Sequence, residues 1–281
     1  MGSIKIVTDS TSDLSAEELQ KHDIHMVPLN IHFRDKTFKD GIDLTPDSFY
    51  AMLTSDPEHP KTSQPSPADF KQKYEELLAD GSVIVSIHIS SKMSGTWQSA
   101  TMAKNELNSD KIHIIDSGFV SIALGLMAVE CARARDEGKS VQDILAMVET
   151  VKSHMRVYFI VDTLEFLQKG GRIGKASAII GGLLNIKPIL MIKDGEVCPY
   201  EKVRGAGKVF IKMGRIFAGY KKENEGREIK LGFAHAAAAD HVEKLSREAN
   251  KTYDVSSAFI TEIGPVVGAH AGPGTLAMCF Y

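Results

Sequence analysis

The stretch Val83-Ile84-Val85-Ser86-Ile87-His88-Ile89-Ser90-Ser91-Lys92-Met93-Ser94-Gly95-Thr96-Trp97-Gln98-Ser99-Ala100 decides the fold class of this chain. Its first seven residues are apolar enough for a buried strand, and residues 98–107 are predicted to form a helix. The Ser-Gly-Thr turn between them leaves backbone N–H groups and hydroxyls at the amino end of that helix. Such a turn favours a small anion, because Gly95 has no Cβ to hold an oxyanion away from the backbone. The same hydroxyls also occur where a loop only caps a helix.

Apolar segments alternate with helical patterns through the first half of the chain. We expect strands at 4–8, 25–32, 83–89 and 112–116, and helices after Ser15 and at 49–53, 68–78, 98–107, 119–137 and 140–154. Residues 34–48 are predicted to form a loop or a short hairpin. This order predicts a mostly parallel sheet with helices on both faces, in an N-terminal α/β domain over residues 1–157.

The pattern changes near residue 158. Strand-like segments at 186–193 and 196–203 flank Asp194-Gly195, a strong hairpin turn. Further strands are expected at 158–161, 228–235, 254–263 and 275–280, with short helices at 163–169 and 175–184 and longer ones at 205–222 and 239–251. We predict a C-terminal α+β domain, residues 158–281, with a mixed or antiparallel sheet, and a ligand in the crevice between the two domains.

Composition excludes several classes of protein. The formal net charge of −3 gives no general basic field for nucleic acid. Cys131, Cys198 and Cys279 lie far apart and show no CxxC or Cys/His metal spacing, which argues against a disulfide framework or a metal site and indicates a reducing compartment. No signal peptide is apparent, and the longest apolar stretch, 176–184, is too short to span a bilayer. We expect a cytoplasmic protein.

Three other segments have side chains suited to an anion. Thr62 and Ser63 lie in a loop that two prolines stiffen, and Arg172 follows a glycine pair with a fork of donors suited to carboxylate or phosphate. His270 is predicted to lie in a turn crowded with glycine and proline over 264–275, where it can donate to an oxyanion or act as an acid or base. Each segment also has a structural interpretation, as a helix cap, a helix end or a buried histidine.

Taken together in this order, these motifs resemble the DegV family, the fatty-acid-binding proteins of bacteria. The resemblance covers residues 4–281. It rests on Thr8-Asp9-Ser10-Thr11, Thr62-Ser63-Gln64-Pro65-Ser66, residues 90–99 with the Ser-Gly-Thr core, Asp162-Thr163-Leu164 through Gly170-Gly171-Arg172-Ile173, Lys187-Pro188-Ile189-Leu190, and residues 264–274 around His270.

The resemblance implies a protein that buries one long-chain fatty acid and presents its carboxylate to a separate ATP-dependent fatty acid kinase. The acyl-phosphate product then passes to phospholipid synthesis. Carboxylate contacts would fall on Thr62, Ser94 and His270, with Ser63, Gly95 and Thr96 beside them. Arg172 would support phosphoryl transfer, and Arg204 would dock the kinase. The bound fatty acid is the ligand; no cofactor, nucleic acid or transmembrane segment is implied, and contact with a membrane surface is compatible with this role.

The physical argument places the affinity in an apolar tunnel, because each buried CH₂ contributes about 0.8 kcal/mol. Candidate tunnel residues are Ile179, Ile180, Leu183, Leu184, Ile189, Leu190 and Met191, although an ordinary core position is the favoured interpretation of any one of them taken singly. No nucleophile–base–acid set, Gly-x-Ser-x-Gly elbow or phosphate-binding loop motif is recognisable, so no catalytic residue is assigned. Two alternatives stay open: an esterase or thioesterase using Ser94 with His270, and a storage or transport protein without a kinase.

Overall fold

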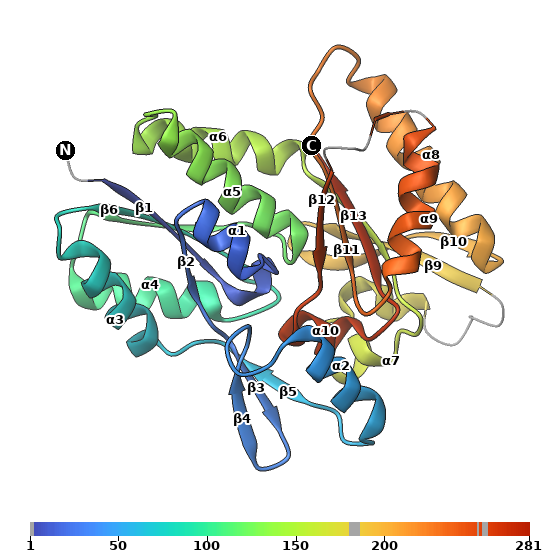
Figure 1. Ribbon diagram of the computed structural model, residues 1–281, viewed down its shortest axis with the longest axis horizontal. Coiled ribbons are helices and arrows are strands. Elements are labelled where there is room, and N and C mark those ends of the chain that lie inside the picture. Colours follow the sequence, from blue (N-terminus) through green and yellow to red (C-terminus); the bar gives the residue numbers. More distant parts are fainter. Residues whose placement is uncertain (1–2, 180–185, 252, 255–257) are drawn as a thin grey trace.

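The computed structural model describes residues 3–179, 186–251, 253–254 and 258–281, which form three sheets with helices between and around them (Figure 1). The first sheet has the order β2-β1-β6-β7, and all its neighbours are parallel. Its strands are β1 (Ile4–Asp9), β2 (Ile24–Val27), β6 (Val83–His88) and β7 (Ile112–Asp116). The parallel sheet predicted from the alternating pattern is confirmed.

Helices cover both faces of this sheet. On one face α3 (Pro67–Leu78) and α4 (Thr96–Leu107) pack against Val7, Ile84 and Ile112. On the other face α5 (Ile122–Asp136) packs against Ile6 and Val85, because successive strand residues point to opposite sides. The remaining helices of this half are α1 (Ala16–Lys21), beside β2, and α6 (Val141–His154), against α5.

The second sheet has the order β10-β9-β8-β13-β11-β12 and is antiparallel except for the parallel pair β11 and β12. Its strands are β8 (Arg156–Ile160), β9 (Ile186–Lys193), β10 (Glu196–Arg204), β11 (Leu231–His235), β12 (Phe259–Glu262) and β13 (Leu276–Phe280). Asp194 and Gly195 both have positive φ, as a tight β9–β10 hairpin turn requires. The predicted hairpin and mixed sheet are therefore confirmed.

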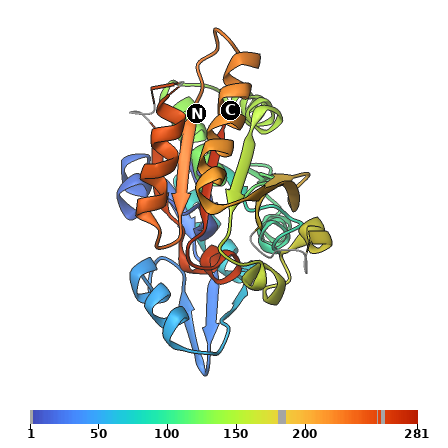
Figure 2. The same cartoon turned by 90° about the vertical axis from the view of Figure 1, so that its right-hand side faces the viewer.

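Helices α8 (Ala206–Glu223) and α9 (Ala239–Asn250) cover the outer face of this sheet, on the side that faces the viewer in Figure 2. Phe217, Phe233 and Phe280 are fully buried beneath them. Two short helical segments precede β9, namely α7 (Glu165–Lys169) and the 3-10 helix η2 (Gly174–Ile179). The rest of the helix predicted at 175–184 lies outside the described residues.

A third, small sheet was not predicted. It has the antiparallel order β4-β3-β5, with β3 (Asn30–Phe33), β4 (Lys36–Lys39) and β5 (Lys61–Ser63), and its β3–β4 hairpin projects from the body of the molecule (Figure 2). The prediction of a single strand over 25–32 was wrong. The segment forms two strands, β2 and β3, which are separated at Pro28 because proline has no N–H to donate to a neighbouring strand. Helix α2 (Pro46–Ser55) joins β4 to β5.

The segment around His270 also differs from its prediction. Residues 265–271 form a helix, α10 (Pro265–Ala271), where a turn was predicted. Pro265 takes the first helical position, where its missing N–H costs nothing and its fixed φ suits the helix. His270 therefore projects from the last turn of a short rigid element.

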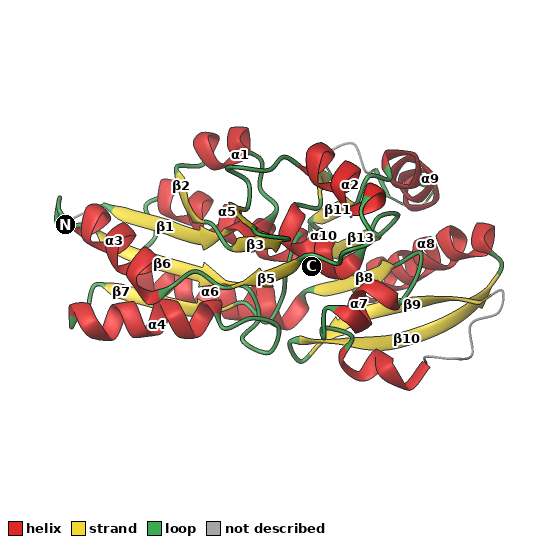
Figure 3. Ribbon diagram, turned by 90° about the horizontal axis from the view of Figure 1, so that it is seen from below, coloured by secondary structure: helices red, strands yellow, loops and turns green. Residues whose placement is uncertain are grey.

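Helix α5 lies between the two larger sheets, which Figure 3 shows side by side along the molecule. It contacts β1, β2 and β6 on one side and β11 and β13 on the other. Most of its residues are buried, as expected for a helix that is apolar all round. The largest core cluster consequently joins residues from both halves, and the division of the chain at residue 157 remains a prediction.

Candidate ligand-binding site

A cavity lies where the two larger sheets and the small sheet meet. The space within it, including the part open to solvent, is about 920 Å³. Most of the residues that line it are apolar: Leu29, Ile89, Met93, Val120, Ile122, Val157, Phe159, Leu167, Ile192, Val197, Ile263, Val266, Val267, Ala271 and Ala277. The polar ones are Thr11, Thr62, Ser63, Gln64, Ser94, Ser121, Arg172, His270 and Thr275.

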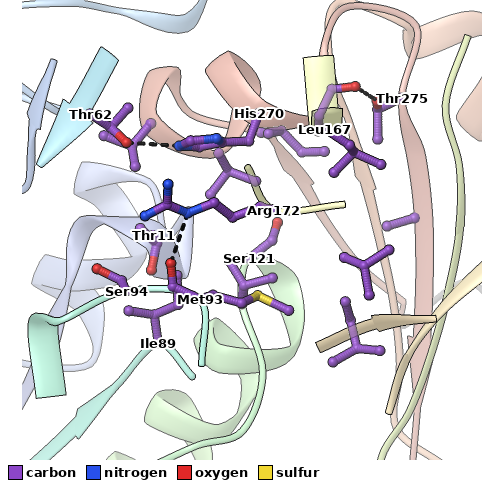
Figure 4. Close-up of a pocket in the computed structure, with 18 of the residues that line it drawn as sticks. Thr11, Thr62, Ile89, Met93, Ser94, Ser121, Leu167, Arg172, His270 and Thr275 are labelled. Carbon is purple, nitrogen blue, oxygen red and sulfur yellow. Dashed lines mark hydrogen bonds between the residues drawn. The ribbon is translucent and has the colours of Figure 1, made fainter. Parts of the chain in front are cut away.

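Several predicted residues meet on one side of this cavity. Figure 4 shows Thr62, His270, Arg172 and Ser94 together there, whereas Leu167 lies apart from them. Among the described residues that line the cavity none is Asp or Glu, so Arg172 is their one permanent charge. This side of the cavity offers hydroxyl, imidazole and guanidinium groups without a competing carboxylate, which suits a small anionic group.

Thr62 and His270 are hydrogen-bonded to each other. Thr62 Oγ1 lies 2.8 Å from His270 Nε2, which joins β5 to the end of α10. Burial, followed by the charges of Arg172 and His59, lowers the pKa of His270 to about 4, although proximity to the Gly170 backbone opposes this shift. The imidazole is therefore neutral at pH 7. Ser63 also lines the cavity, and its hydroxyl lies 2.8 Å from His32 Nε2 within the small sheet.

Arg172 is held by two backbone carbonyls. Its Nε donates to Met93 O at 3.0 Å, and its Nη1 donates to Gly170 O at 2.8 Å. The second bond satisfies the carbonyl at the end of α7, as the structural interpretation of this arginine predicts. No Asp or Glu in the described part of the chain forms an ion pair with Arg172. The side chain is exposed, and its charge is available at the mouth of the cavity.

The Ser-Gly-Thr turn contributes one residue to the cavity. Ser94 lines it, but Gly95 and Thr96 do not, and Thr96 is fully buried. Ser94 Oγ lies 2.9 Å from Thr96 Oγ1 at the start of α4. The space beside Gly95 is taken by another side chain, because a Cβ there would lie 2.9 Å from Gln64 Nε2. Gln64 was not predicted as a site residue, and it lines the cavity.

Arg204 lies apart from this site. It ends β10 and lines a separate surface depression with Lys202, Lys208, Lys212 and Arg215. Four of the candidate tunnel residues lie in the described part of the chain, and none of them lines the cavity: Ile179, Ile189, Leu190 and Met191. Ile189 and Met191 pack in the core under α8 and α9, on the opposite face of the sheet. Ile180, Leu183 and Leu184 lie outside the described residues.

Part of the apolar wall of the cavity comes from strand residues that were not predicted to line it. Val157 and Phe159 of β8 line the cavity, and the intervening Tyr158 faces the other core. The alternation of side chains along a strand places residues 157 and 159 on one face of the sheet and residue 158 on the other. The sequence alone does not show which of these two faces lines the cavity. Thr11 and Ser121 were missed as well, and each hydroxyl donates to a buried carboxylate at 2.5 Å, Thr11 to Asp9 and Ser121 to Asp13.

The geometry does not assemble Ser94 with His270 as a nucleophile and its base. His270 Nε2 is bonded to Thr62, and His270 Nδ1 has no hydrogen-bond partner among the described residues. A hydrogen-bonded Ser86–His88–Asp9 set does exist, with Ser86 Oγ at 2.7 Å and Asp9 Oδ2 at 3.0 Å from the ring of His88. All three side chains are fully buried and none lines the cavity, so this set holds β1 to β6.

Over the described residues, no group of three or more His, Cys, Asp or Glu side chains is placed to hold a metal ion. The helices found in that same part of the chain are all too short or too polar to cross a membrane.

The fold and the cavity define an α/β protein with two large sheets and an amphipathic ligand cavity between them. The family model described as "Uncharacterised protein, DegV family" matches residues 3–281, and the chain belongs to the DegV family.

Relatives of known sequence and structure match over nearly the whole chain. The protein DegV of Bacillus subtilis is 34% identical over 278 residues, which are 99% of this chain and 98% of that protein. A DegV family protein of Thermus thermophilus, whose structure is described for fatty acid binding, has 35% identity and a TM-score of 0.94, with 99% of each chain covered. A stearic-acid-binding protein of Eubacterium ventriosum has 28% identity and a TM-score of 0.90, covering 99% of this chain and 97% of its own.

Proposed function

We propose that this chain binds one long-chain fatty acid in the cavity, with the carboxylate among Thr62, Ser94 and His270. The observation that supports this most is the polarity of the cavity: it is mainly apolar, and the described residues that line it include an arginine and a histidine but no carboxylate. Fatty-acid binding in the Thermus and Eubacterium relatives is consistent with the same ligand class.

The apolar wall supplies most of the affinity in this proposal. Each CH₂ removed from water contributes about 0.8 kcal/mol, so the acyl chain outweighs one or two hydrogen bonds to the head group. Thr62, Ser94 and the imidazole then fix the carboxylate in place. Ser63 lines the cavity beside Thr62, whereas Gly95 and Thr96 lie behind Ser94 at the amino end of α4.

We infer further that the bound carboxylate is presented to a separate ATP-dependent kinase, and that the acyl-phosphate goes to phospholipid synthesis. Arg172 supports this step because its charge is unpaired by any described carboxylate and lies at the cavity mouth. Arg204, on a basic depression away from the cavity, is the proposed docking residue. We propose a cytoplasmic site of action, with contact to a membrane surface during lipid exchange.

Native mass spectrometry of protein purified from a bacterial host tests the ligand. We expect a near-stoichiometric C14–C18 fatty acid. Ser94→Ala should weaken retention by about 0.5–1.5 kcal/mol, the usual contribution of one hydrogen bond, whereas Ser91→Ala, in the same loop but outside the cavity, should not. Folded, lipid-free protein that takes up neither palmitate nor oleate would contradict the proposal. Hydrolysis of an acyl ester without any partner would favour the esterase alternative.

A further inference from the structure

Ser90 begins the loop between β6 and α4 that carries two residues of the site, Met93 and Ser94. Its N–H donates to Phe119 O at 2.9 Å. Its carbonyl accepts the N–H of Met93 at 2.9 Å and the N–H of Ser94 at 3.1 Å. Because Met93 and Ser94 both line the cavity, the position of the Ser90 backbone determines where this part of the wall lies.

The side chain of Ser90 reaches the other half of the molecule. Its hydroxyl donates to Gly195 O at 2.7 Å, in the β9–β10 turn and 105 residues further along the chain. Ser90 is buried, and the packing is tight, because a Cβ on Gly195 would lie 2.6 Å from Ser90 Oγ. This hydroxyl therefore fixes the loop that bears Ser94 against the second sheet.

The same part of the second sheet contacts the segment that bears Arg172. Gly174 begins η2, two residues after Arg172, and a Cβ on it would lie 2.5 Å from Val197 O. Val197 itself lines the cavity. Residues 195–197 thus lie against both segments that bring polar side chains to the proposed head-group position, the loop with Ser94 and the turn with Arg172.

These two segments are also bonded to each other. Arg172 Nε donates to Met93 O at 3.0 Å, and Met93 N–H in turn donates to Ser90 O. A continuous series of hydrogen bonds therefore runs from the β9–β10 turn through Ser90 and Met93 to the guanidinium. Figure 4 shows the last bond of this series, between Arg172 and the Met93 carbonyl.

The adjacent Ser91 provides a matched comparison. Its hydroxyl donates to Asp116 Oδ2 at 2.5 Å, at the end of β7 in the first sheet. Ser91 is exposed and does not line the cavity. Two neighbouring serines thus each contribute a hydroxyl hydrogen bond to one loop, but the bond of Ser90 crosses to the second sheet and the bond of Ser91 stays within the first.

We propose that Ser90 is a positioning residue for the head-group end of the ligand. Its bond to the β9–β10 turn fixes Ser94 and, through the Met93 carbonyl, Arg172. The hold on the loop rests on the structure alone, and its effect on the ligand also rests on the proposed function. Without the hydroxyl the loop is no longer bonded to the turn, and Ser94 loses its fixed position beside the carboxylate. The contribution of the acyl chain to affinity stays the same, because strands and helices outside this loop supply most of the apolar wall.

The first experiment needs no ligand and follows amide hydrogen exchange by NMR in delipidated protein. Ser90→Ala should accelerate exchange of the Met93 and Ser94 amides by at least about fivefold, because one hydrogen bond that holds their loop is lost. Ser91→Ala, which removes a hydroxyl from the same loop, should change these two rates by less than about twofold. Equal exchange of both amides in wild type and Ser90→Ala would overturn the proposal.

The second experiment measures palmitate affinity in wild type, Ser90→Ala, Ser94→Ala and the double variant. Ser90→Ala should lower affinity by about two- to tenfold, the range for one hydrogen bond. In the Ser94→Ala background it should have little effect, because the side chain that it positions is absent. Additive losses would show that Ser90 does not act through Ser94 and would overturn the proposal. If wild type binds no palmitate, the proposed function fails, and the exchange experiment still decides whether Ser90 holds the loop.

Gly195→Ala tests the same contact from the side of the turn. Gly195 has a φ of +80° and Gly226 a φ of +84°, so alanine is strained at both positions, but only at Gly195 would its Cβ meet Ser90 Oγ. Gly195→Ala should therefore lower palmitate affinity by about two- to tenfold, whereas Gly226→Ala, with no atom within 4 Å of its Cβ, should not. Equal affinity of these two variants would contradict a role for the turn in holding Ser90.

Discussion

At the scale of single residues, the proposed function makes the charge of His270 depend on the ligand. Burial and the nearby Arg172 charge lower its pKa to about 4. A carboxylate beside Nε2 has the opposite effect, because it stabilises the imidazolium. The same histidine is thus neutral without a ligand and can bind a proton together with one. Thr62, which bonds to Nε2, keeps the ring in the orientation that receives the carboxylate.

We predict that fatty-acid binding raises the pKa of His270. The loaded protein then binds more protons than the free protein at pH values above about 4, so affinity falls as the pH rises through the loaded-state pKa. NMR titration of the imidazole in free and palmitate-loaded protein measures both values. His113, which lies on β7 and does not line the cavity, serves as the internal control. Equal pKa values for His270 in the two forms would place the carboxylate elsewhere.

We predict that replacing Arg172 impairs phosphoryl transfer to the bound fatty acid much more than it impairs fatty-acid binding. Phosphoryl transfer builds negative charge that a positioned guanidinium stabilises, whereas the buried acyl chain supplies most of the affinity. Arg172→Ala should therefore lose kinase-dependent acyl-phosphate formation by at least about a hundredfold while palmitate binding changes little. Arg172→Lys keeps the charge and loses the bidentate geometry. Its rate of acyl-phosphate formation should therefore lie between those of wild type and Arg172→Ala. The assay uses the cognate kinase, ATP and loaded protein; wild-type transfer by Arg172→Ala would show that the arginine is only a helix cap.

At the scale of elements, the site depends on a contact between two short helices, α7 and α10. Gly170, at the end of α7, lies so close to the imidazole that a Cβ there would be 2.0 Å from His270 Nδ1. Glycine is needed at this position for space, not for backbone conformation, since Gly170 has a helical φ of −75°. The polar end of the cavity is therefore assembled by packing between elements about a hundred residues apart in the chain.

Gly170→Ala should displace His270 and break its 2.8 Å contact with Thr62. We expect fatty-acid affinity to fall by about tenfold, the equivalent of one hydrogen bond, with little loss of global stability because α7 is short and at the cavity mouth. Gly219→Ala, in α8 with nothing near its Cβ, is the matched control and should raise stability by about 0.5–1 kcal/mol. Unchanged affinity in Gly170→Ala would mean that the imidazole does not hold the ligand.

Elements with strong local signals could be predicted from the sequence, and the others could not. Asp194-Gly195 specifies its own hairpin, and Ser15 and Ser140 cap their helices through local contacts. Helix α10 was missed because its glycines lower helix propensity and it is held mainly by tertiary contacts with α2 and α7. The sequence identified four candidate residues from their chemistry, namely Thr62, Ser94, Arg172 and His270. The contact between Thr62 and His270 could not be predicted, because it joins residues far apart in the chain and no local pattern encodes it.

At the scale of the whole molecule, the two halves share their main core. Helix α5 packs against both large sheets, and the core cluster includes Ile6 and Val85 of the first sheet together with Val157, Phe159 and Ala277 of the second. Separating the halves would expose this cluster and the cavity wall to water at about 25 cal/mol per Å² of apolar surface. A boundary at residue 157, although it agrees with the change in strand order, therefore does not require two independently folding units.

We predict a single cooperative unfolding transition in which both halves unfold together. Calorimetric and van't Hoff enthalpies should agree, and Trp97 fluorescence, which reports on α4, should change at the same temperature as far-UV circular dichroism. If the ligand is held between the halves, as proposed, palmitate at a hundred times its Kd should add about 2.7 kcal/mol and raise the Tm by roughly 5–10 °C for the whole transition. Two resolved transitions, with only one shifted by palmitate, would show that residues 1–157 and 158–281 fold separately and that the ligand is held by one of them.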